Sequence, residues 1–408
     1  MKQFSIPAKY KSPLITSIKK KRRELDKQKK DFSSTILDFG PLKIILARHF
    51  GFCYGVENAI EIAFRTVEEN PGKRIFLLSE MIHNPFVNND LLDMGVQFLM
   101  DTKGNNIIPF EELNREDIVM IPAFGTTLEI EKKLTEIGIQ IEKYNTTCPF
   151  VEKVWNRAEQ IAAKGFSIVV HGKPSHEETR ATFSHSDKYT PTLVINNLSE
   201  AEVLGQFMLG EKPENEFYDF FKGRYSDGFD MNKHLSKFGV VNQTTMLASD
   251  TQEIVDFLRH IMLNKFPQEK ENISERFADT RDTLCYATND NQTAVKSMLE
   301  NNADLSIVIG GRNSSNSSHL VELSENKLLT YFIESESDLI SAESIKAYNW
   351  KTHEEYIKHQ YLPSKKPLRI LLTSGASCPD AIVENVIEKL LTFFPGTTSL
   401  EEIKQEWT

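Results

Sequence analysis

The chain repeats one local pattern from Leu42 almost to its end: a short apolar segment, a loop of small or polar residues, and a stretch with the hydrophobic spacing of an amphipathic helix. The apolar segments predict strands at 43–47, 74–78, 118–121, 167–170, 238–241, 305–309 and 368–372. Strands that alternate with helices predict an α/β protein with parallel sheets. In such sheets a ligand binds beyond the carboxyl ends of the strands, so the loops after the strands are the expected place for a functional site.

Three similar α/β domains are expected, because a chain of 408 residues exceeds the roughly 250–300 residues at which a single core stops growing. The predicted domains are 43–147, 148–284 and 285–395, followed by a C-terminal tail at 396–408. Two stretches interrupt the pattern, near 205–237 and 341–366, and we expect both to be surface insertions. Residues 1–42 are expected to form a basic N-terminal extension that is mobile or helical and lies in solvent.

The charge is unevenly distributed along the chain. The total is −10, from 48 basic and 58 acidic residues. Residues 1–42 hold eleven basic and four acidic residues, so residues 43–408 carry −17. A body this acidic is a poor binder of polyanions, which argues against nucleic acid as a partner.

Neither the hydropathy nor the cysteine usage indicates a membrane or secreted protein. No apolar run approaches the roughly 18 residues of a membrane-spanning helix, so we expect no membrane segment. The N-terminus lacks the apolar region of a secretory signal, and four cysteines are too few for a disulfide scaffold. We therefore expect a cytoplasmic protein, with a plastid-type organelle as the alternative because the basic N-terminus weakly resembles a transit peptide.

Three of the four cysteines, Cys53, Cys148 and Cys285, lie next to a predicted turn or helix start, in the sequences GFCYG, TTCPF and TLCYAT. Their separations of 95 and 137 residues match no zinc-finger or ferredoxin spacing, and a single cysteine is usually a small buried hydrophobe. The exposed N–H groups at a helix N-terminus, however, stabilise a thiolate and make it a better ligand. Three such cysteines predict a metal or iron–sulfur site with one open position. Cys378 is expected to be a small buried side chain, with a fourth ligand as the alternative.

Hydroxyl and amide side chains are concentrated in the loops after three predicted strands. Residues 313–318 read Asn-Ser-Ser-Asn-Ser-Ser, and the segments 243–245 and 374–377 occupy equivalent places. A helix cap needs only one such residue, whereas 313–318 offers six. Together with backbone N–H groups, these side chains predict a phosphate- or diphosphate-binding site.

Two further loops contain groups suited to anion binding and proton transfer. They are the loop with His83 and the segment 176–179, which reads His-Glu-Glu-Thr. A histidine can bind phosphate oxygens, and a glutamate near an anion should have a raised pKa that suits proton delivery.

Together these motifs resemble the 4-hydroxy-3-methylbut-2-enyl diphosphate reductase family, also called the LytB family. The matching segments occur in the family's order between Lys43 and about Phe394: GFCYGVENAI, HNPFVNNDLLDMG, AFGTT, TTCPFVEKVW, HGKPSHEETRAT, NQTTM, CYATNDNQTAV, GGRNSSNSSHL and TSGASCPD. AFG, HEET and the long insertion before NQTT also resemble the plant and cyanobacterial branch of this family.

The resemblance implies three α/β domains in a trefoil around a central [4Fe–4S] cluster that is held by Cys53, Cys148 and Cys285 and has one open iron. It implies reductive dehydroxylation of 4-hydroxy-3-methylbut-2-enyl diphosphate to isopentenyl and dimethylallyl diphosphate, the last step of the non-mevalonate isoprenoid pathway. Two electrons would be delivered through the cluster. Glu178 is the implied proton source, and Thr244 supports it at the substrate hydroxyl. The implied diphosphate ligands are His83, His176, Ser314, Ser315, Asn316 and Ser377.

The resemblance also implies binding partners for the protein, and other functions remain as alternatives. The partners are the small diphosphate substrate and an electron donor such as a ferredoxin or a flavodoxin, and the protein is expected to be a monomer or a homodimer. Phe124 departs from the family pattern, because many bacterial members have a histidine there that contacts the diphosphate. The alternative functions are an iron–sulfur hydro-lyase, which needs no electrons, and a non-catalytic iron–sulfur sensor; a structural zinc site of three cysteines is a further alternative.

Overall fold

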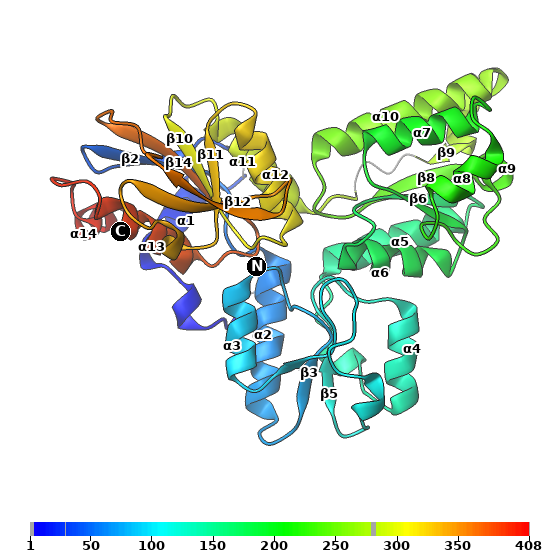
Figure 1. Ribbon diagram of the computed structural model, residues 1–408, viewed down its shortest axis with the longest axis horizontal. Coiled ribbons are helices and arrows are strands. Elements are labelled where there is room, and N and C mark those ends of the chain that lie inside the picture. The colour runs from blue at the N-terminus through cyan, green and yellow to red at the C-terminus, as the bar shows by residue number, and fades with distance from the viewer. Residues whose placement is uncertain (1–3, 29, 279–282, 408) are drawn as a thin grey trace. The chain divides into compact units, whose positions relative to one another are not determined.

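The computed structural model describes residues 4–28, 30–278 and 283–407, and Figure 1 labels its helices and strands. The chain divides into two compact units. Unit 1 comprises Met1–Glu57, His83–Val87 and Tyr286–Thr408, and unit 2 comprises Asn58–Ile82 and Asn88–Cys285. The core strands of both units pair in parallel, apart from one antiparallel edge strand, so the prediction of an α/β protein with parallel sheets is confirmed. The trefoil arrangement stays a prediction.

Unit 1 is built on one five-stranded sheet in the order β1-β2-β14-β10-β11. Four of these strands consist almost entirely of buried residues, as expected for parallel strands that are covered on both faces. The strands are β1 (Thr35–Asp38), β2 (Leu42–Leu46), β10 (Leu305–Ile309), β11 (Thr330–Ile333) and β14 (Leu368–Ser374). The helices are α1 (Pro13–Leu25), α11 (Tyr286–Met298), α12 (Ser315–Glu325), α13 (Asp380–Leu391) and α14 (Leu400–Trp407), with the 3-10 turns η1 (Ala8–Tyr10) and η5 (Glu336–Asp338).

The first predicted strand lies in a different sheet from the one expected. β2 pairs in parallel with β14, with Leu42 opposite Leu368 and Leu46 opposite Leu372, and both strands belong to unit 1. The predicted domain 43–147 therefore begins in the wrong sheet. The hydrophobic pattern indicates that a strand is present, but it does not specify which strand it pairs with.

The N-terminal extension packs into unit 1, so the expectation that it lies in solvent is wrong. Helix α1 begins after Ser12, whose hydroxyl accepts a hydrogen bond from the Ile15 backbone N–H at 2.9 Å. Leu14, Ile15 and Ile18 are buried in the core of unit 1, and β1 then pairs antiparallel with β2. Each buried aliphatic side chain contributes roughly 1.5–3 kcal/mol of hydrophobic stabilisation, so the extension is part of the fold.

Unit 2 contains two parallel sheets, in the orders β4-β3-β5 and β7-β6-β8-β9. The strands are β3 (Ile75–Leu77), β4 (Gln97–Phe98), β5 (Ile118–Met120), β6 (Ser167–His171), β7 (Thr192–Ile195), β8 (Phe238–Asn242) and β9 (Phe277–Ala278). Helices α2 (Tyr54–Glu69) and α3 (Pro85–Asp93) begin in unit 1 and continue into unit 2. The other helices are α4 (Leu128–Ile137), α5 (Pro149–Ala162), α6 (Glu177–Asp187), α7 (Leu198–Met208), α8 (Glu214–Phe220), α9 (Met231–His234) and α10 (Ala248–Lys265). The 3-10 turns are η2 (Phe110–Glu112), η3 (Glu142–Tyr144) and η4 (Pro267–Glu275). Val169 and Val170 are consecutive residues of β6, so their side chains lie on opposite faces of the sheet. They belong to separate apolar clusters, so the four-stranded sheet is covered on both faces.

The two predicted insertions differ in how they pack. The stretch near 205–237 contains α8 and α9, and its Phe217 and Phe221 are completely buried in the core of the four-stranded sheet. It is therefore part of the core as well as of the surface, because its aromatic side chains cover one face of the sheet. The stretch near 341–366 forms a hairpin of β12 (Ser344–Asn349) and β13 (Glu354–His359).

Within the described ranges, no helix is both long enough and apolar enough to cross a lipid bilayer.

Candidate active site

The first turn of α12 carries two buried polar groups that have no hydrogen-bond partner among the described residues. Ser314 caps α12, because its hydroxyl accepts hydrogen bonds from the Ser317 backbone N–H at 3.2 Å and from the Ser317 hydroxyl at 3.0 Å. The Asn316 side-chain oxygen accepts a hydrogen bond from the Ala376 N–H at 3.0 Å. In the part of the chain that the structure describes, the Ser315 hydroxyl and the Asn316 Nδ2 group are buried and have no hydrogen-bond partner. Buried polar groups are nearly always paired, so these two donors indicate a ligand site at the N-terminus of α12.

His83 and Ser377 lie against the same loop in unit 1. The Ser377 hydroxyl donates to the His83 carbonyl oxygen at 3.2 Å. Gly311, at the start of the loop, packs so closely on this carbonyl group that a Cβ atom there would overlap it. The structure therefore gathers the diphosphate ligands expected in this unit, which are His83, Ser314, Ser315, Asn316 and Ser377.

The loop that contains Cys53 is tied to the loop after β14. The Cys53 backbone N–H donates to the Ala376 carbonyl oxygen at 3.1 Å, and the Gly51 N–H donates to the Ser374 hydroxyl at 3.1 Å. Gly51 has a φ angle of 78°, in the left-handed region that favours glycine, and a Cβ atom there would overlap the Asp380 carboxylate. The first cysteine therefore lies next to the loop that carries Ser377.

Lys19 of the N-terminal extension also contacts the loop that contains Cys53. Its Nζ atom donates to the Phe50 carbonyl oxygen at 2.8 Å and to Asp380 Oδ1 at 2.7 Å. The same ammonium group lies 4.6 Å from the centre of the Phe50 ring. A bond to the carbonyl group three residues before Cys53 restricts the path of the loop.

Two aromatic residues of the extension contact the residues on either side of Cys53. The Tyr10 ring packs edge to face on the Phe52 ring with 5.8 Å between their centres. The Phe4 ring packs in the same way on Tyr54 at 4.9 Å. A segment outside the recognisable motifs therefore holds a predicted cluster ligand, and no local sequence signal indicated this role.

Glu178 and Thr244 are hydrogen-bonded to each other in unit 2. The Thr244 backbone N–H donates to Glu178 Oε1, and its hydroxyl donates to Oε2 at 3.0 Å. The Glu178 residue is only 1% exposed. The Cys285 backbone N–H donates to the Thr244 carbonyl oxygen at 3.2 Å. A buried carboxyl group, a hydroxyl group and the third cysteine are thus direct neighbours.

His176 is the N-cap of α6. Its Nδ1 atom accepts a hydrogen bond from the Glu178 backbone N–H at 3.2 Å, which places the proton of the neutral ring on Nε2. The Phe124 ring contacts the His176 ring edge to face, with 5.7 Å between their centres. The phenylalanine that replaces the family's histidine therefore packs on another predicted diphosphate ligand. The neighbouring Glu177 accepts a hydrogen bond from the Ser79 hydroxyl.

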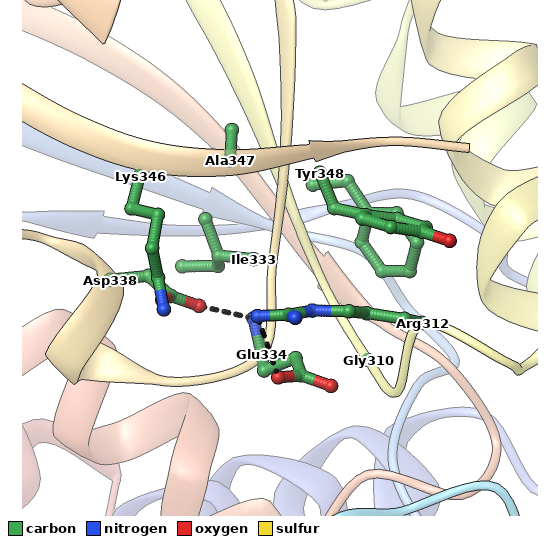
Figure 2. Close-up of a pocket in the computed structure, with 9 residues that line it drawn as sticks. Gly310, Arg312, Ile333, Glu334, Asp338, Lys346, Ala347 and Tyr348 are labelled. Atoms are coloured by element: carbon green, nitrogen blue, oxygen red, sulfur yellow. Dashed lines mark hydrogen bonds and ion pairs between the residues drawn. The ribbon is translucent and has the colours of Figure 1, made fainter. Parts of the chain in front are cut away.

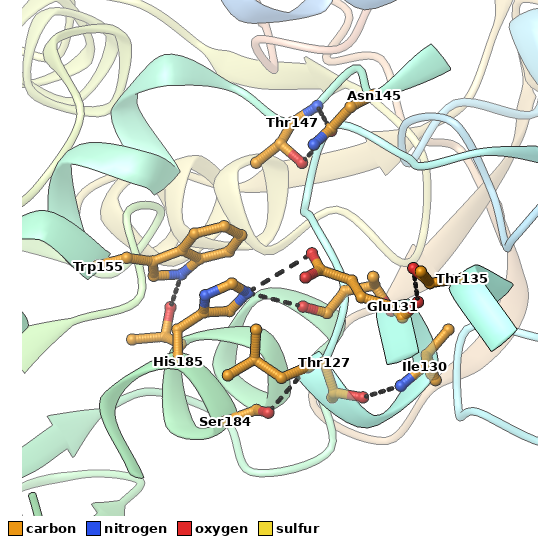
Figure 3. A network of polar contacts seen from close by, with 12 residues as sticks. Thr127, Ile130, Glu131, Thr135, Asn145, Thr147, Trp155, Ser184 and His185 are labelled. Atoms are coloured by element: carbon orange, nitrogen blue, oxygen red, sulfur yellow. Dashed lines mark hydrogen bonds and ion pairs between the residues drawn. The ribbon is translucent and has the colours of Figure 1, made fainter. Parts of the chain in front are cut away.

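His185 and Trp155 support the turn that carries Phe124. No site role was predicted for either residue, although Trp155 ends the matching segment TTCPFVEKVW. Figure 3 shows the two rings stacked, with 3.6 Å between their centres and an angle of 7° between their planes. His185 Nε2 lies 3.2 Å from the Thr126 carbonyl oxygen, and burial lowers the pKa of His185 to about 4, so the ring is neutral and donates its Nε2 proton. A Cβ atom at Gly125 would lie 2.5 Å from Trp155, which explains the glycine at this position.

The thiol group of Cys148 lies near Cys285 and Glu178. The pKa of Cys148 is raised to about 12, chiefly by burial and to a smaller extent by the negative charges of Cys285 and Glu178. The N–H groups of Phe150 and Val151 at the start of α5 lower the pKa, as expected, but burial outweighs them. Stabilisation of the thiolate by the helix N-terminus is therefore not the dominant effect at this cysteine.

The cysteines as a set fit an iron–sulfur cluster. Among the described residues, Cys53, Cys148 and Cys285 form no disulfide bond and are partly exposed. Cys378 is buried, and its Sγ atom lies 3.6 Å from the Pro379 carbonyl oxygen. Thiolates are the usual ligands of such clusters, and a protonated thiol releases its proton when it binds a metal. Cys53 belongs to unit 1 and the other two to unit 2; within the described residues, neither unit by itself gathers three His, Cys, Asp or Glu side chains into a metal-binding group.

These features define an α/β protein in which three cysteines and the predicted anion-binding groups lie in or next to strand-to-helix loops. The family model described as LytB protein matches residues 44–391, and the chain belongs to this family.

The relatives have one enzyme name in common. A 4-hydroxy-3-methylbut-2-enyl diphosphate reductase from Prochlorococcus marinus subsp. pastoris is 40% identical over 383 residues, which cover 94% of this chain and 90% of that protein. An enzyme of the same name from Picosynechococcus sp. is 39% identical over 385 residues, which cover 94% of this chain and 89% of that protein. The predicted family and its cyanobacterial-type branch are confirmed.

A solved structure shares the fold. The E-1-hydroxy-2-methyl-but-2-enyl-4-diphosphate reductase from Plasmodium falciparum matches with a TM-score of 0.62 and 23% sequence identity, over 88% of this chain and 90% of that chain.

Proposed function

We propose that this protein reduces 4-hydroxy-3-methylbut-2-enyl diphosphate to isopentenyl and dimethylallyl diphosphate, the last step of the non-mevalonate pathway. Relatives that carry this enzyme name cover almost the whole chain at about 40% identity, as the Prochlorococcus enzyme does. The observation that carries the proposal is the pair of buried, unpaired donors at Ser315 and Asn316. A diphosphate group supplies the acceptors that these donors lack, at a helix N-terminus that favours an anion.

The diphosphate site combines hydroxyl, amide and imidazole donors in this proposal. Ser314, Ser315, Asn316 and Ser377 present hydroxyl and amide groups, and His83 and His176 add imidazole N–H groups. These groups supply hydrogen bonds to the diphosphate oxygens. Their role is to bind and orient the substrate so that its hydroxyl end lies at the reacting groups.

Cys53, Cys148 and Cys285 would hold one [4Fe–4S] cluster. When bound, such a cluster supplies the two electrons and an iron without a protein ligand that acts as a Lewis acid toward the substrate hydroxyl. The electrons come from outside the protein, and we propose a ferredoxin or a flavodoxin as the donor. A cytoplasmic location and a monomeric or homodimeric state stay predictions.

Glu178 is the proposed proton source. The reaction breaks the C–O bond to the hydroxyl group, which leaves as water, and forms a new C–H bond, so it consumes two electrons and two protons. A buried carboxyl group is pushed toward its protonated form by desolvation and by a nearby anion, and it can then protonate the leaving hydroxyl group. Thr244 holds both carboxyl oxygens and so fixes the direction in which Glu178 donates.

Anaerobic turnover tests the proposed function. The purified protein would be incubated with 4-hydroxy-3-methylbut-2-enyl diphosphate and dithionite-reduced methyl viologen, and the products separated by chromatography. We expect both diphosphate products with the reductant and none without it. Conversion that needs no reductant would instead indicate a hydro-lyase, and a cluster-containing protein that neither binds nor converts the substrate would indicate a sensor.

A further inference from the structure

Arg312 lies in the turn that leads into the proposed diphosphate site. The Ser314 backbone N–H donates to the Gly311 carbonyl oxygen at 2.9 Å, which closes a turn between β10 and α12 with Arg312 at its second position. An arginine two residues before an anion-binding helix N-terminus would ordinarily be taken as a phosphate ligand.

The guanidinium group of Arg312 is instead bound by two carboxylates. Its Nη2 atom lies 3.1 Å from Glu334 Oε2, directly after β11, and Figure 2 shows these two side chains together. Its Nη1 atom forms an ion pair with Glu355 of β13. Its Cζ atom lies 5.6 Å from the centre of the Tyr348 ring in β12. Three elements outside the proposed substrate site therefore contact this one side chain.

The β12–β13 hairpin presents one polar face to Arg312. Tyr348 and Glu355 are directly opposite each other in the two strands, so their side chains lie on the same face. Lys346, two residues before Tyr348, shares this face; its Nζ atom lies 2.9 Å from Asp338 Oδ1 and 3.9 Å from Glu355 Oε1. Asp338 in turn accepts a hydrogen bond from the Glu334 backbone N–H at 2.8 Å. The network therefore contains three carboxylates and two cations.

We propose that Arg312 is a positioning residue and that the β12–β13 hairpin is the brace through which it fixes the N-terminus of α12. The turn is held at both ends: Gly311 packs on the His83 carbonyl group, and Ser314 caps the helix. Arg312 fixes the middle of the turn to the sheet and the hairpin. This inference deepens the proposed function and rests on it, since the groups that the turn positions are the proposed diphosphate ligands.

The brace and a direct phosphate contact predict opposite effects for one substitution. Glu355→Gln removes a carboxylate that holds Arg312. If Arg312 is a brace, the turn loosens and diphosphate binding weakens. If Arg312 binds phosphate directly, the loss of a competing carboxylate frees the guanidinium group and diphosphate binding strengthens. Arg312→Met weakens binding in both cases, so the sign of the Glu355 effect distinguishes them.

The experiment measures the inhibition constant of inorganic pyrophosphate, with KM and kcat, in the cluster-loaded variants Arg312→Met, Glu355→Gln and their combination. Glu354→Gln is the matched control, because Glu354 is the exposed neighbour of Glu355 on the other face of β13. The ion pair is partly exposed, with 30% and 44% of the two side chains accessible, so a modest effect is expected. We expect the inhibition constant and KM to rise at least about threefold in both single variants, with little change in kcat. In the double variant, the inhibition constant and KM should be no higher than in Arg312→Met, because the two residues act through one contact.

Hydrogen exchange gives a second readout that does not depend on turnover. The amides of residues 314–318 should exchange faster in Glu355→Gln than in the unsubstituted protein or in Glu354→Gln. Tighter pyrophosphate binding in Glu355→Gln would refute the positioning role of Arg312. Unchanged amide exchange together with unchanged pyrophosphate binding would also refute it. The protein could lack reductase activity while the amide exchange of residues 314–318 still increases in Glu355→Gln. That result would refute the proposed function but support the structural role of Arg312.

Discussion

Thr244 donates two hydrogen bonds to one carboxyl group, from its backbone N–H to Glu178 Oε1 and from its hydroxyl to Glu178 Oε2. Glu178 lies in the first turn of α6 and Thr244 in the loop after β8, 66 positions apart in the chain. The carboxyl group is therefore fixed by a second loop of the same sheet.

Glu178→Gln should preserve the site but abolish most of the turnover. A glutamine can accept the hydrogen bond from the Thr244 N–H and donate its own N–H to the Thr244 hydroxyl, so the local structure should remain. It cannot release a proton, and the loss of a general acid slows a reaction by about 100-fold or more. Steady-state turnover measures this effect, and substrate titration of the oxidised, iron-loaded protein checks binding.

Glu177→Gln is the control for this prediction. Glu177 is also buried, but it accepts a hydrogen bond from the Ser79 hydroxyl, whereas Thr244 donates both of its hydrogen bonds to Glu178. A collapse of turnover in Glu177→Gln, with near-normal turnover in Glu178→Gln, would move the proton source away from Glu178.

The four cysteines should separate into two groups when they are replaced by serine. We expect Cys53→Ser, Cys148→Ser and Cys285→Ser to lose most of the bound iron, because each removes a proposed thiolate ligand. Cys378→Ser should keep its iron and instead lower the melting temperature, since Cys378 is 1% exposed in the apolar core of unit 1. The iron content of anaerobically purified protein tests this division, and an iron loss in Cys378→Ser equal to the others would refute the three-cysteine assignment.

Lys19→Met should weaken both the fold and the cysteine loop. The substitution removes the bonds to the Phe50 carbonyl oxygen and to Asp380, three residues before Cys53 and at the start of α13. We expect a lower melting temperature of the iron-free protein and a faster loss of iron from the loaded protein. Lys20→Met is the matched control, because Lys20 is exposed on the same helix.

Deletion of residues 1–31 extends this test. It removes Leu14, Ile15 and Ile18 from the core of unit 1, so the truncated protein should be unstable. A truncated protein that melts at the normal temperature and retains its iron would show that the extension does not support the fold.

His185 should make the stability of unit 2 depend on pH. Burial lowers the pKa of this histidine from 6.5 to about 4, so the unfolded chain binds a proton in a range where the folded chain does not. The free energy of unfolding should therefore fall as the pH drops from about 6.5 to about 4, by at most about 3 kcal/mol from this group. In His185→Gln, which keeps an N–H donor for the Thr126 carbonyl oxygen, this part of the pH dependence should disappear.

His260→Gln serves as the comparison, because His260 is exposed on α10. Chemical denaturation at several pH values would measure the difference. Identical pH profiles for His185→Gln and the unsubstituted protein would show that the histidine does not remain neutral in the folded state.

Much of the fold follows from local sequence patterns. Each predicted strand is present to within two residues at each end, and the segment 305–309 is a strand over its full length. These segments could be identified because an unbroken apolar run between polar loops is typical of a strand that is buried on both faces. The cysteines and the 313–318 segment could be identified because chemically reactive or polar residues beside a strand end have few purely structural roles.

The tertiary structure decided how these elements combine. Pairing of β2 with β14 depends on contacts across more than 300 residues, and a hydrophobic run carries no information about its partner. Likewise, the support of Cys53 by Lys19 and of the 311–314 turn by Glu355 depends on long-range polar contacts. The sequence by itself therefore determined the class of fold and the chemical groups of the site. Only folding decided which distant side chains hold those groups in place, because contact energies depend on three-dimensional proximity and not on order along the chain.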